Sequence, residues 1–241
     1  MRPELMDDPS APRGELARSL GFIRGVNRVL GGRRALLWHL NRWSQRWPHR
    51  GPVTLLDVGT GSADLPLAAR RWAAARGLDL RITAVDLHPT TLDLARAHTA
   101  GADGITLVQA DALRLDDLYA PGSFDYVHAG MFLHHLGADD VVRCLGVMDR
   151  LARVGLIWND LLRSRMSLAL LAPLLIGQPR MVRHDAAASV RAGFTRREAL
   201  AAAAAAGIGY ATFRTFAVGR FTVAGERPGA AWEPRGDTLP P

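Results

Sequence analysis

The residues best suited to chemistry stand where short apolar runs of the sequence end. Asp57 precedes a Gly-Thr-Gly turn, and Asp86 and Asp111 follow the next two runs. His128 closes a fourth run, and Asp160 follows a fifth. If these runs are strands of a mostly parallel sheet, their carboxyl ends meet at one edge, where such sheets bind ligands. The spacing therefore predicts one shared site for these side chains.

The turn after the first run favours a positively charged ligand. Gly59 and Gly61 allow a tight turn and a close approach of the backbone to a bound molecule. A dinucleotide-binding fingerprint would carry glycine or alanine where Asp64 stands. Asp57 and Asp64 together would repel a pyrophosphate at short range, whereas they would attract a cation. We therefore expect a cationic ligand at this turn.

The elements that must position these residues alternate between strand and helix. Strands are predicted at 53–58, 80–85, 105–109, 124–128, 154–158, 212–218 and 220–224, and helices at 63–76, 89–99, 138–151 and 195–206. Ser62 is the predicted N-cap of the first of these helices. This order indicates an α/β fold, with a doubly wound sheet of seven mostly parallel strands between helices.

Two further segments are expected to cover the carboxyl ends of the strands. Residues 15–47 have a helical pattern that is broken at Gly31-Gly32. Their apolar side chains form one stripe, made of Leu36, Leu40, Trp43 and Trp47. The stripe has three readings: a lid on the pocket, an interfacial helix on an anionic membrane, or a dimer contact. Residues 159–194, with an apolar helix near 166–175, are too long for an ordinary loop and form a second cap.

The charge distribution argues against a nucleic-acid partner. The net charge is +7, but residues 1–50 hold 10 arginines and 4 acidic residues, whereas the rest holds 20 and 19. The main part of the chain is thus nearly neutral, and a phosphate-binding surface would make it basic. The longest apolar stretch, 166–176, is too short to span a membrane. With no secretory signal at the start, we expect a cytoplasmic protein, a monomer or a homodimer.

Residues 52–225 resemble the class I S-adenosylmethionine-dependent methyltransferases. The resemblance is carried by the glycine-rich motif Asp57-Val58-Gly59-Thr60-Gly61, by Asp86, by Asp111 and by the fourth motif at 124–128. Residues 131–136, Met-Phe-Leu-His-His-Leu, are common in the small-molecule, quinone-methyltransferase-like branch. The resemblance implies a Rossmann-like sheet and the cofactor S-adenosyl-L-methionine. Ala63 stands where many members carry a third glycine.

The resemblance also implies which residues hold the cofactor. Asp86 would accept hydrogen bonds from the ribose hydroxyls, with Leu87 against the adenine. Asp111 would accept from the adenine amino group, and the Ala112 backbone would donate to the ring. The full predicted cofactor set is Asp57, Gly59, Thr60, Gly61, Asp86, Leu87, Asp111, Ala112 and His128.

The catalytic candidates are His135, His184 and Asp160. Histidine is the side chain best matched to proton removal near neutral pH, and His135 and His184 could approach the acceptor from two sides. Asp160 is the carboxylate alternative. Adjacent His134 and His135 look like a metal site, but consecutive residues are expected to point apart, so no metal is predicted. 

The predicted function is methyl transfer to a small, largely apolar acceptor, most directly O-methylation of a phenolic or polyketide-type hydroxyl. The alternatives are C-methylation of a quinone precursor and a catalytically silent binding protein with the same fold. The predicted division is a tail and helical lid over 1–51, a methyltransferase domain over 52–225 with the 159–194 cap, and a flexible tail over 226–241. Peripheral membrane contact through 15–47 stays open.

Overall fold

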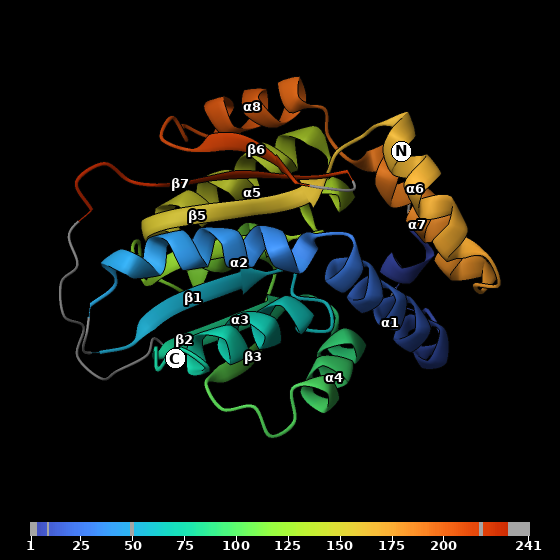
Figure 1. The fold of residues 1–241 in the computed structure, drawn as a ribbon, viewed down its shortest axis with the longest axis horizontal. Helices are drawn as coiled ribbons and strands as arrows, with labels where there is room; N and C mark the ends of the chain where they lie inside the picture. Colours follow the sequence, from blue (N-terminus) through green and yellow to red (C-terminus); the bar gives the residue numbers. More distant parts are fainter. Residues whose placement is uncertain (1–3, 9, 49–50, 217–218, 231–241) are drawn as a thin grey trace.

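The computed structural model describes residues 4–8, 10–48, 51–216 and 219–230 of the chain. Within these residues seven strands form one sheet in the order β3-β2-β1-β4-β5-β7-β6 (Figure 1). The strands are β1 Val53–Val58, β2 Leu80–Asp86, β3 Ile105–Gln109, β4 Phe124–Gly130, β5 Ala152–Leu161, β6 Thr212–Phe216 and β7 Arg220–Glu226. The first five pair in parallel, and β7 runs antiparallel to both β5 and β6. The predicted fold class is confirmed.

Helices cover both faces of the sheet. They are α1 Arg13–Val29, α2 Gly32–Trp43, α3 Asp64–Ala74, α4 Pro89–His98, α5 Ala138–Leu151, α6 Arg165–Leu171, α7 Arg180–Ala192 and α8 Arg196–Ala205. Every residue of β1 is buried, as expected of a parallel strand covered on both sides. Leu55 packs with α2 and α3, and Leu56 packs with α5 and α8. Successive side chains of β1 therefore point to opposite faces of the sheet and contribute to two separate hydrophobic cores.

The predicted apolar stripe lies on the sheet and not on a pocket. Leu36, Leu40, Trp43 and Trp47 are buried in the same core as Val53, Leu55 and Tyr126. The Trp43 ring stacks on Tyr126 at 5.0 Å, and the Trp47 indole donates to the Tyr126 hydroxyl at 3.0 Å. The reading of this stripe as a lid is wrong, because α2 belongs to the helical layer beside α3.

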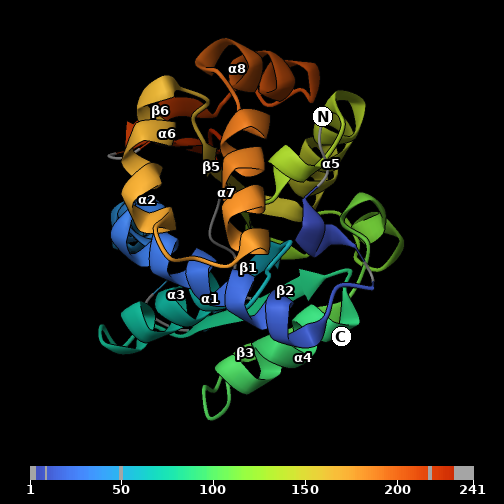
Figure 2. The same ribbon diagram turned by 90° about the vertical axis from the view of Figure 1, so that its right-hand side faces the viewer.

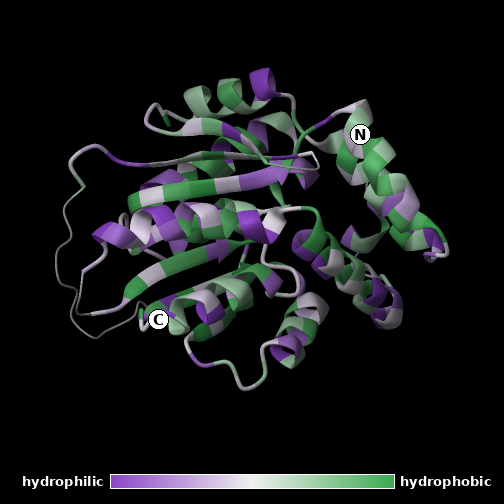
Figure 3. Cartoon of the chain, in the orientation of Figure 1, coloured by the Kyte–Doolittle hydropathy of each residue, from purple (hydrophilic) through white to green (hydrophobic). Residues whose placement is uncertain are grey.

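The carboxyl ends of the strands are covered by α1, α6 and α7 instead (Figure 2). Figure 3 shows β5 changing from hydrophobic to hydrophilic toward that end, where Asn159 and Asp160 lie. A short 3-10 turn, Leu5–Asp7, packs against α1, which follows it in the sequence, and against the distant helix α7. Residues 4–8 are called the N-terminal strap below.

Two local expectations needed correction. The residue before α3 is Ala63, in a left-handed conformation with φ 54°, and not the predicted cap Ser62. Asn159 and Asp160 lie inside β5, because β5 is paired there with both Gly130 of β4 and Phe221 of β7. By contrast, Thr195 caps α8 as predicted, in a capping box with Glu198. No helix among the described residues has the length and apolarity to cross a membrane.

Candidate active site

Two cavities adjoin at the carboxyl ends of the strands. The larger has a volume of about 630 Å³ and the smaller about 50 Å³. Met6, Ile23 and Met131 line both. Met131 follows β4 with a φ of 57°, a left-handed conformation that residues other than glycine rarely adopt. Backbone strain of this kind persists only where the surroundings fix it, and here it lies between the two cavities.

The glycine loop after β1 forms one wall of the larger cavity. Gly59 has a φ of 65°, and a Cβ atom there would lie 2.3 Å from Cγ of Phe132. The backbone N–H of Gly61 donates to Oδ2 of Asp86 at 2.8 Å, and that of Thr60 donates to the Val85 carbonyl at 2.9 Å. The loop is thus tied to the end of β2, and both predicted glycines are needed for its shape.

Asp86 lines this cavity and has acceptor lone pairs that its protein contacts do not use. Its Oδ1 accepts the backbone N–H of His88 at 3.0 Å, in addition to the Gly61 contact. Burial raises the pKa of Asp86, and these two backbone hydrogen bonds partly oppose the rise. A carboxylate has about four lone-pair sites, so two remain for a ligand's hydroxyl groups. Leu87 beside it is 64% exposed and also lines the cavity.

Of the two residues predicted to hydrogen-bond to adenine, Ala112 lines the larger cavity, whereas Asp111 caps a helix. Oδ1 of Asp111 accepts the backbone N–H of Leu113 at 2.9 Å and so caps a short 3-10 helix, Ala112–Asp117. Ala110 and Ala112 line the larger cavity, whereas Asp111 is not among its described lining residues. The contact of Asp111 with adenine stays a prediction.

Asp57 is paired with His128 across neighbouring strands. Both side chains are buried, and Nδ1 of His128 is hydrogen-bonded to Oδ1 of Asp57. Asp57 lines the larger cavity, whereas His128 stands behind it. Asp64 lines the cavity as well; burial raises its pKa, and Nδ2 of Asn27 donates to it at 3.1 Å. With Asp57, Asp64 and Asp86 on its walls, this cavity favours a ligand that carries positive charge.

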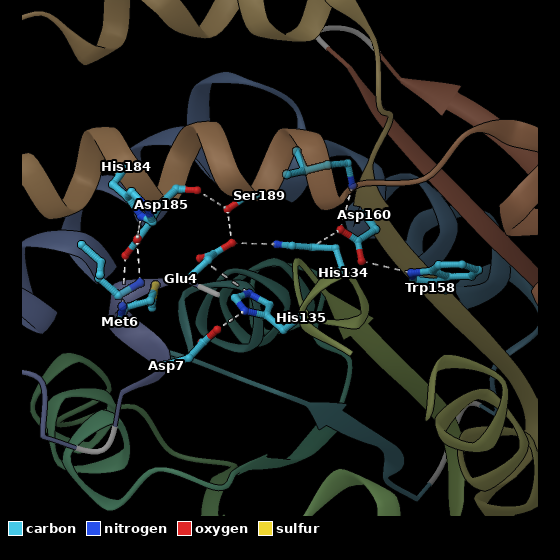
Figure 4. Close-up of polar contacts among 12 residues, drawn as sticks. Glu4, Met6, Asp7, His134, His135, Trp158, Asp160, His184, Asp185 and Ser189 are labelled. Atoms are coloured by element: carbon cyan, nitrogen blue, oxygen red, sulfur yellow. Dashed lines mark hydrogen bonds and ion pairs between the residues drawn. The ribbon is translucent and has the colours of Figure 1, made fainter. Parts of the chain in front are cut away.

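The two adjacent histidines do not point apart. They lie in a 3-10 turn, Leu133–His135, with ring centroids 4.4 Å apart, and both face Glu4 of the strap (Figure 4). Nε2 of His134 is 3.6 Å from Oε1 of Glu4, and Nδ1 of His135 is 2.9 Å from Oδ2 of Asp7. The reason given above for dismissing a metal is therefore wrong. His135 also lines the larger cavity, as an acid–base group there must.

Asp160 contacts His134 and does not face a cavity. Its Oδ1 lies 2.6 Å from Nδ1 of His134, and its Oδ2 accepts the Trp158 indole N–H at 3.2 Å. Asp160 is fully buried and lines neither cavity in the described part of the chain. Burial disfavours the charged form of His134, but Asp160 and Glu4 outweigh it and raise the pKa of His134 to about 10. Asp160 therefore positions a buried imidazolium.

The N-terminal strap is held by α7. Oδ1 and Oδ2 of Asp185 accept the backbone N–H groups of Leu5 and Met6 at 2.8 and 3.1 Å (Figure 4). The Ser189 hydroxyl donates to Oε1 of Glu4. His184 contacts Asp185 at 2.9 Å but lines neither cavity among the described residues. Sequence reasoning missed Glu4, Asp7 and Ser189, because no local motif marks them.

Comparison with known proteins agrees with this geometry. Residues 55–155 match the family model of the methyltransferase domain, a stretch that includes the glycine loop, Asp86 and both histidines. The chain has the fold of human N-acetylserotonin methyltransferase in complex with S-adenosylmethionine. The TM-score is 0.63 at 14% identity, over 90% of this chain and 56% of that one. Residues 55–155 are thus a methyltransferase domain.

Two curated relatives match this methyltransferase domain in part. The ribosomal protein L11 methyltransferase of Geotalea uraniireducens is 38% identical over 88 residues, 36% of this chain and 26% of the relative. The demethylmenaquinone methyltransferase of Staphylococcus epidermidis is 27% identical over 130 residues, 54% of this chain and 51% of the relative. The chain thus spans between a quarter and a half of the curated relatives' length.

The larger cavity of the methyltransferase domain fits the family's cofactor, S-adenosyl-L-methionine. The hydroxyls of Thr60 and Ser62 are buried in its wall and have no hydrogen-bond partner among the described residues. Gly59 leaves room where a Cβ would intrude, and Asp86 retains acceptor sites. The carboxylates complement a sulfonium and an ammonium group. Backbone cradle, carboxylates and unpartnered hydroxyls together match a positively charged, hydroxyl-bearing ligand.

The smaller cavity has a different character. Its walls come from α1, α6, α7, β5 and the strap, and they are mostly apolar. The apolar lining is Met6, Phe22, Ile23, Val26, Leu30, Met131, Leu161, Leu171, Val182, Ala186 and Val190. Cavities of this kind bind apolar molecules and orient them with few polar groups.

Proposed function

We propose that this methyltransferase domain methylates a hydroxyl oxygen of a small, largely apolar acceptor, of phenolic or polyketide type. The observation that carries the proposal is the apolar cavity beside the larger one, with Met6, Ile23 and Met131 common to both. An acceptor held in the smaller cavity would meet a methyl donor held in the larger one. Proximity and alignment of the two reactants would supply much of the rate enhancement.

The cofactor-holding residues of this proposal are those that line the larger cavity. Asp86 would accept the two ribose hydroxyls, and Leu87 and Ala112 would lie against the adenine. Asp57 and Asp64 would face the positively charged methionine part, with His128 fixing Asp57 from behind. When bound, S-adenosylmethionine supplies an activated methyl group on a sulfonium sulfur.

His135 is the proposed general base. A hydrogen bond from its Nδ1–H to Asp7 leaves Nε2 with a lone pair to take the acceptor's hydroxyl proton. The deprotonated acceptor oxygen would then be the nucleophile for the methyl group that the cofactor supplies, and His135 would hold the proton. His184 lines neither cavity within the described residues, so it is the weaker candidate. The strap would exclude water from the reacting atoms.

Carbon methylation of a quinone precursor is the second candidate. It is favoured by the similarity over 130 residues to a demethylmenaquinone methyltransferase. The same base would generate a phenolate, whose ring carbon would be the nucleophile. A silent binding protein would keep both cavities but turn over nothing. We further propose that the strap and α1 cover the site, whereas α2 belongs with residues 52–225.

The test is a panel of phenols, polyketide-type hydroxyls and quinone precursors with isotopically labelled S-adenosylmethionine. Product mass and NMR give the methylated atom. A methyl ether from a phenol supports the first candidate, and a ring methyl from a quinone precursor supports the second. Tight S-adenosylmethionine binding without turnover of any panel member would contradict both and favour the binding protein.

A further inference from the structure

Arg220 is a buried arginine with unused hydrogen-bond donors. It is the first residue of β7, its side chain is 0% exposed, and it lines the smaller cavity. Its Nη2 donates to Oδ1 of Asn27 at 2.8 Å. Nε and Nη1 have no hydrogen-bond partner among the residues that the structure describes. A buried cation without a paired anion is costly, so it calls for a reason.

No carboxylate in the described part of the chain forms an ion pair with Arg220. Burial lowers the pKa of its guanidinium to about 10, against the attraction of Asp160 and Asp64, so it stays charged at neutral pH. Asp160 is committed to His134, and Asp64 is reached only through Asn27, whose Nδ2 donates to it at 3.1 Å. Asn27 therefore accepts from Arg220 and donates to Asp64, which fixes both the amide and the guanidinium in orientation.

The other polar groups around the smaller cavity also leave donors free and acceptors occupied. Its acidic residues are already engaged: Glu4 accepts from Ser189, and Asp185 accepts from two backbone N–H groups of the strap. The hydroxyl of Ser19, which also lines this cavity, has no partner among the described residues. Among the described residues, the groups left free in the wall are thus a guanidinium, which only donates, and a hydroxyl, which can donate.

We propose that Arg220, with Ser19, is an anion subsite of the smaller cavity, and that the acceptor carries a carboxylate or an ionised phenolic oxygen that binds there. The proposal rests on the proposed function, since it names the chemical class of that function's acceptor. An oxygen anion that accepts from Nε or from Nη1 supplies the missing charge and one of the missing acceptors. The rest of the acceptor lies against the apolar walls.

The first experiment uses the wild-type chain loaded with S-adenosylhomocysteine and measures binding by calorimetry. The probes are 2-hydroxybenzoate and the neutral 2-hydroxybenzamide of nearly the same shape. A charged hydrogen bond is worth enough to make the carboxylate bind about 10- to 100-fold more tightly. A third probe, 4-nitrophenol, is measured on both sides of its ionisation to separate phenolate from carboxylate binding. Equal affinities throughout would overturn the proposal.

Variants then assign the preference to Arg220. In Arg220→Met the preference for the anion should disappear, and in Arg220→Lys it should persist in part, because the charge remains. Arg34→Met removes an exposed arginine of α2 and is the matched control. Arg220→Met should also melt a few degrees higher without ligand, because an uncompensated buried charge is gone. A purely structural arginine would give the opposite shift and leave the preference intact.

The cofactor is the competing source of an anion, through its methionine carboxylate. Comparing S-adenosylhomocysteine with 5′-methylthioadenosine, which lacks that carboxylate, separates the two. The proposal expects Arg220→Met to change neither affinity by more than about twofold. Selective loss of S-adenosylhomocysteine binding would assign Arg220 to the cofactor and overturn it. Because these readouts are binding constants, they decide the proposal even if no acceptor is ever methylated.

Discussion

The two cavities of this protein are built in contrasting ways. The larger is formed mainly by the ends of β1, β2 and β4 and by the loops that follow them. Much of its shape comes from backbone groups, as at Gly59 and Gly61. The smaller is formed by side chains from both ends of the sequence, from Glu4 of the strap to Arg220 of β7. Under the proposed function, the common methyl donor would be held by a regular loop, while selectivity for the acceptor would lie with packing between distant segments.

The sharpest test of this contrast concerns His135, which borders the larger cavity. Replacing it with alanine removes the proposed base, so kcat should fall by about 10²–10⁴ while the affinity for S-adenosylmethionine stays unchanged. Steady-state rates with an acceptor from the panel, together with calorimetry, measure both. His184→Ala is the matched control and should keep near-normal rates. A larger loss at His184 than at His135 would reverse the assignment.

A second test breaks the backbone cradle of the larger cavity. Gly59→Ala places a Cβ within 2.3 Å of Phe132 at a φ of 65°, so the loop must shift. Strain and overpacking of this size should weaken S-adenosylmethionine binding by about 100-fold. Gly77→Ala is the matched control, because Gly77 has a φ of 67° and nothing within 4 Å of an added Cβ. Equal affinities in the two variants would show that the close approach is irrelevant.

A third and smaller expected effect is the pH-dependent stabilisation that His134 provides through Asp160 and through Glu4 of the strap. The pKa of His134 is raised from 6.5 to about 10, mainly by Asp160 and Glu4, which outweigh its burial. A raised pKa means that the stabilisation is fully present below pH 6.5 and is lost as the pH rises through about 10. His134→Gln should therefore melt a few degrees below the wild type at pH 6.5, and the gap should close toward pH 10. A gap that is constant with pH would contradict a charged His134.

The sequence predicted the larger cavity much better than the smaller one. The strand ends and the glycine loop depend on local patterns, so β1, β3 and α5 were located to the residue and Asp57 and Asp86 were placed on one cavity. The smaller cavity depends on contacts such as Asn27 with Arg220, which lie 193 residues apart. No spacing rule connects such positions. Arg220 reads locally as the ordinary first residue of a strand.

Two misreadings have specific physical causes. The stripe on α2 is a correct helical pattern, but periodicity does not tell which surface a helix covers, and the sheet competes with the pocket for it. The two histidines were expected to point apart because they are consecutive, whereas the 3-10 turn at Leu133–His135 brings the rings together. Both errors concern how an element is placed and not whether it exists.

The strap has a consequence for the order of events in turnover. Its residues line both cavities, and it is tied down by Asp185, Ser189 and His135. If a methylated acceptor leaves past the strap, these contacts must open first, so we expect release, and not methyl transfer, to limit each cycle. Rapid quenching should then show a burst of about one product per enzyme molecule before the slower steady state. Loosening the strap with Asp185→Asn should speed the steady state and leave the burst unchanged, whereas product formation that is linear from the start would place the slow step in the chemistry.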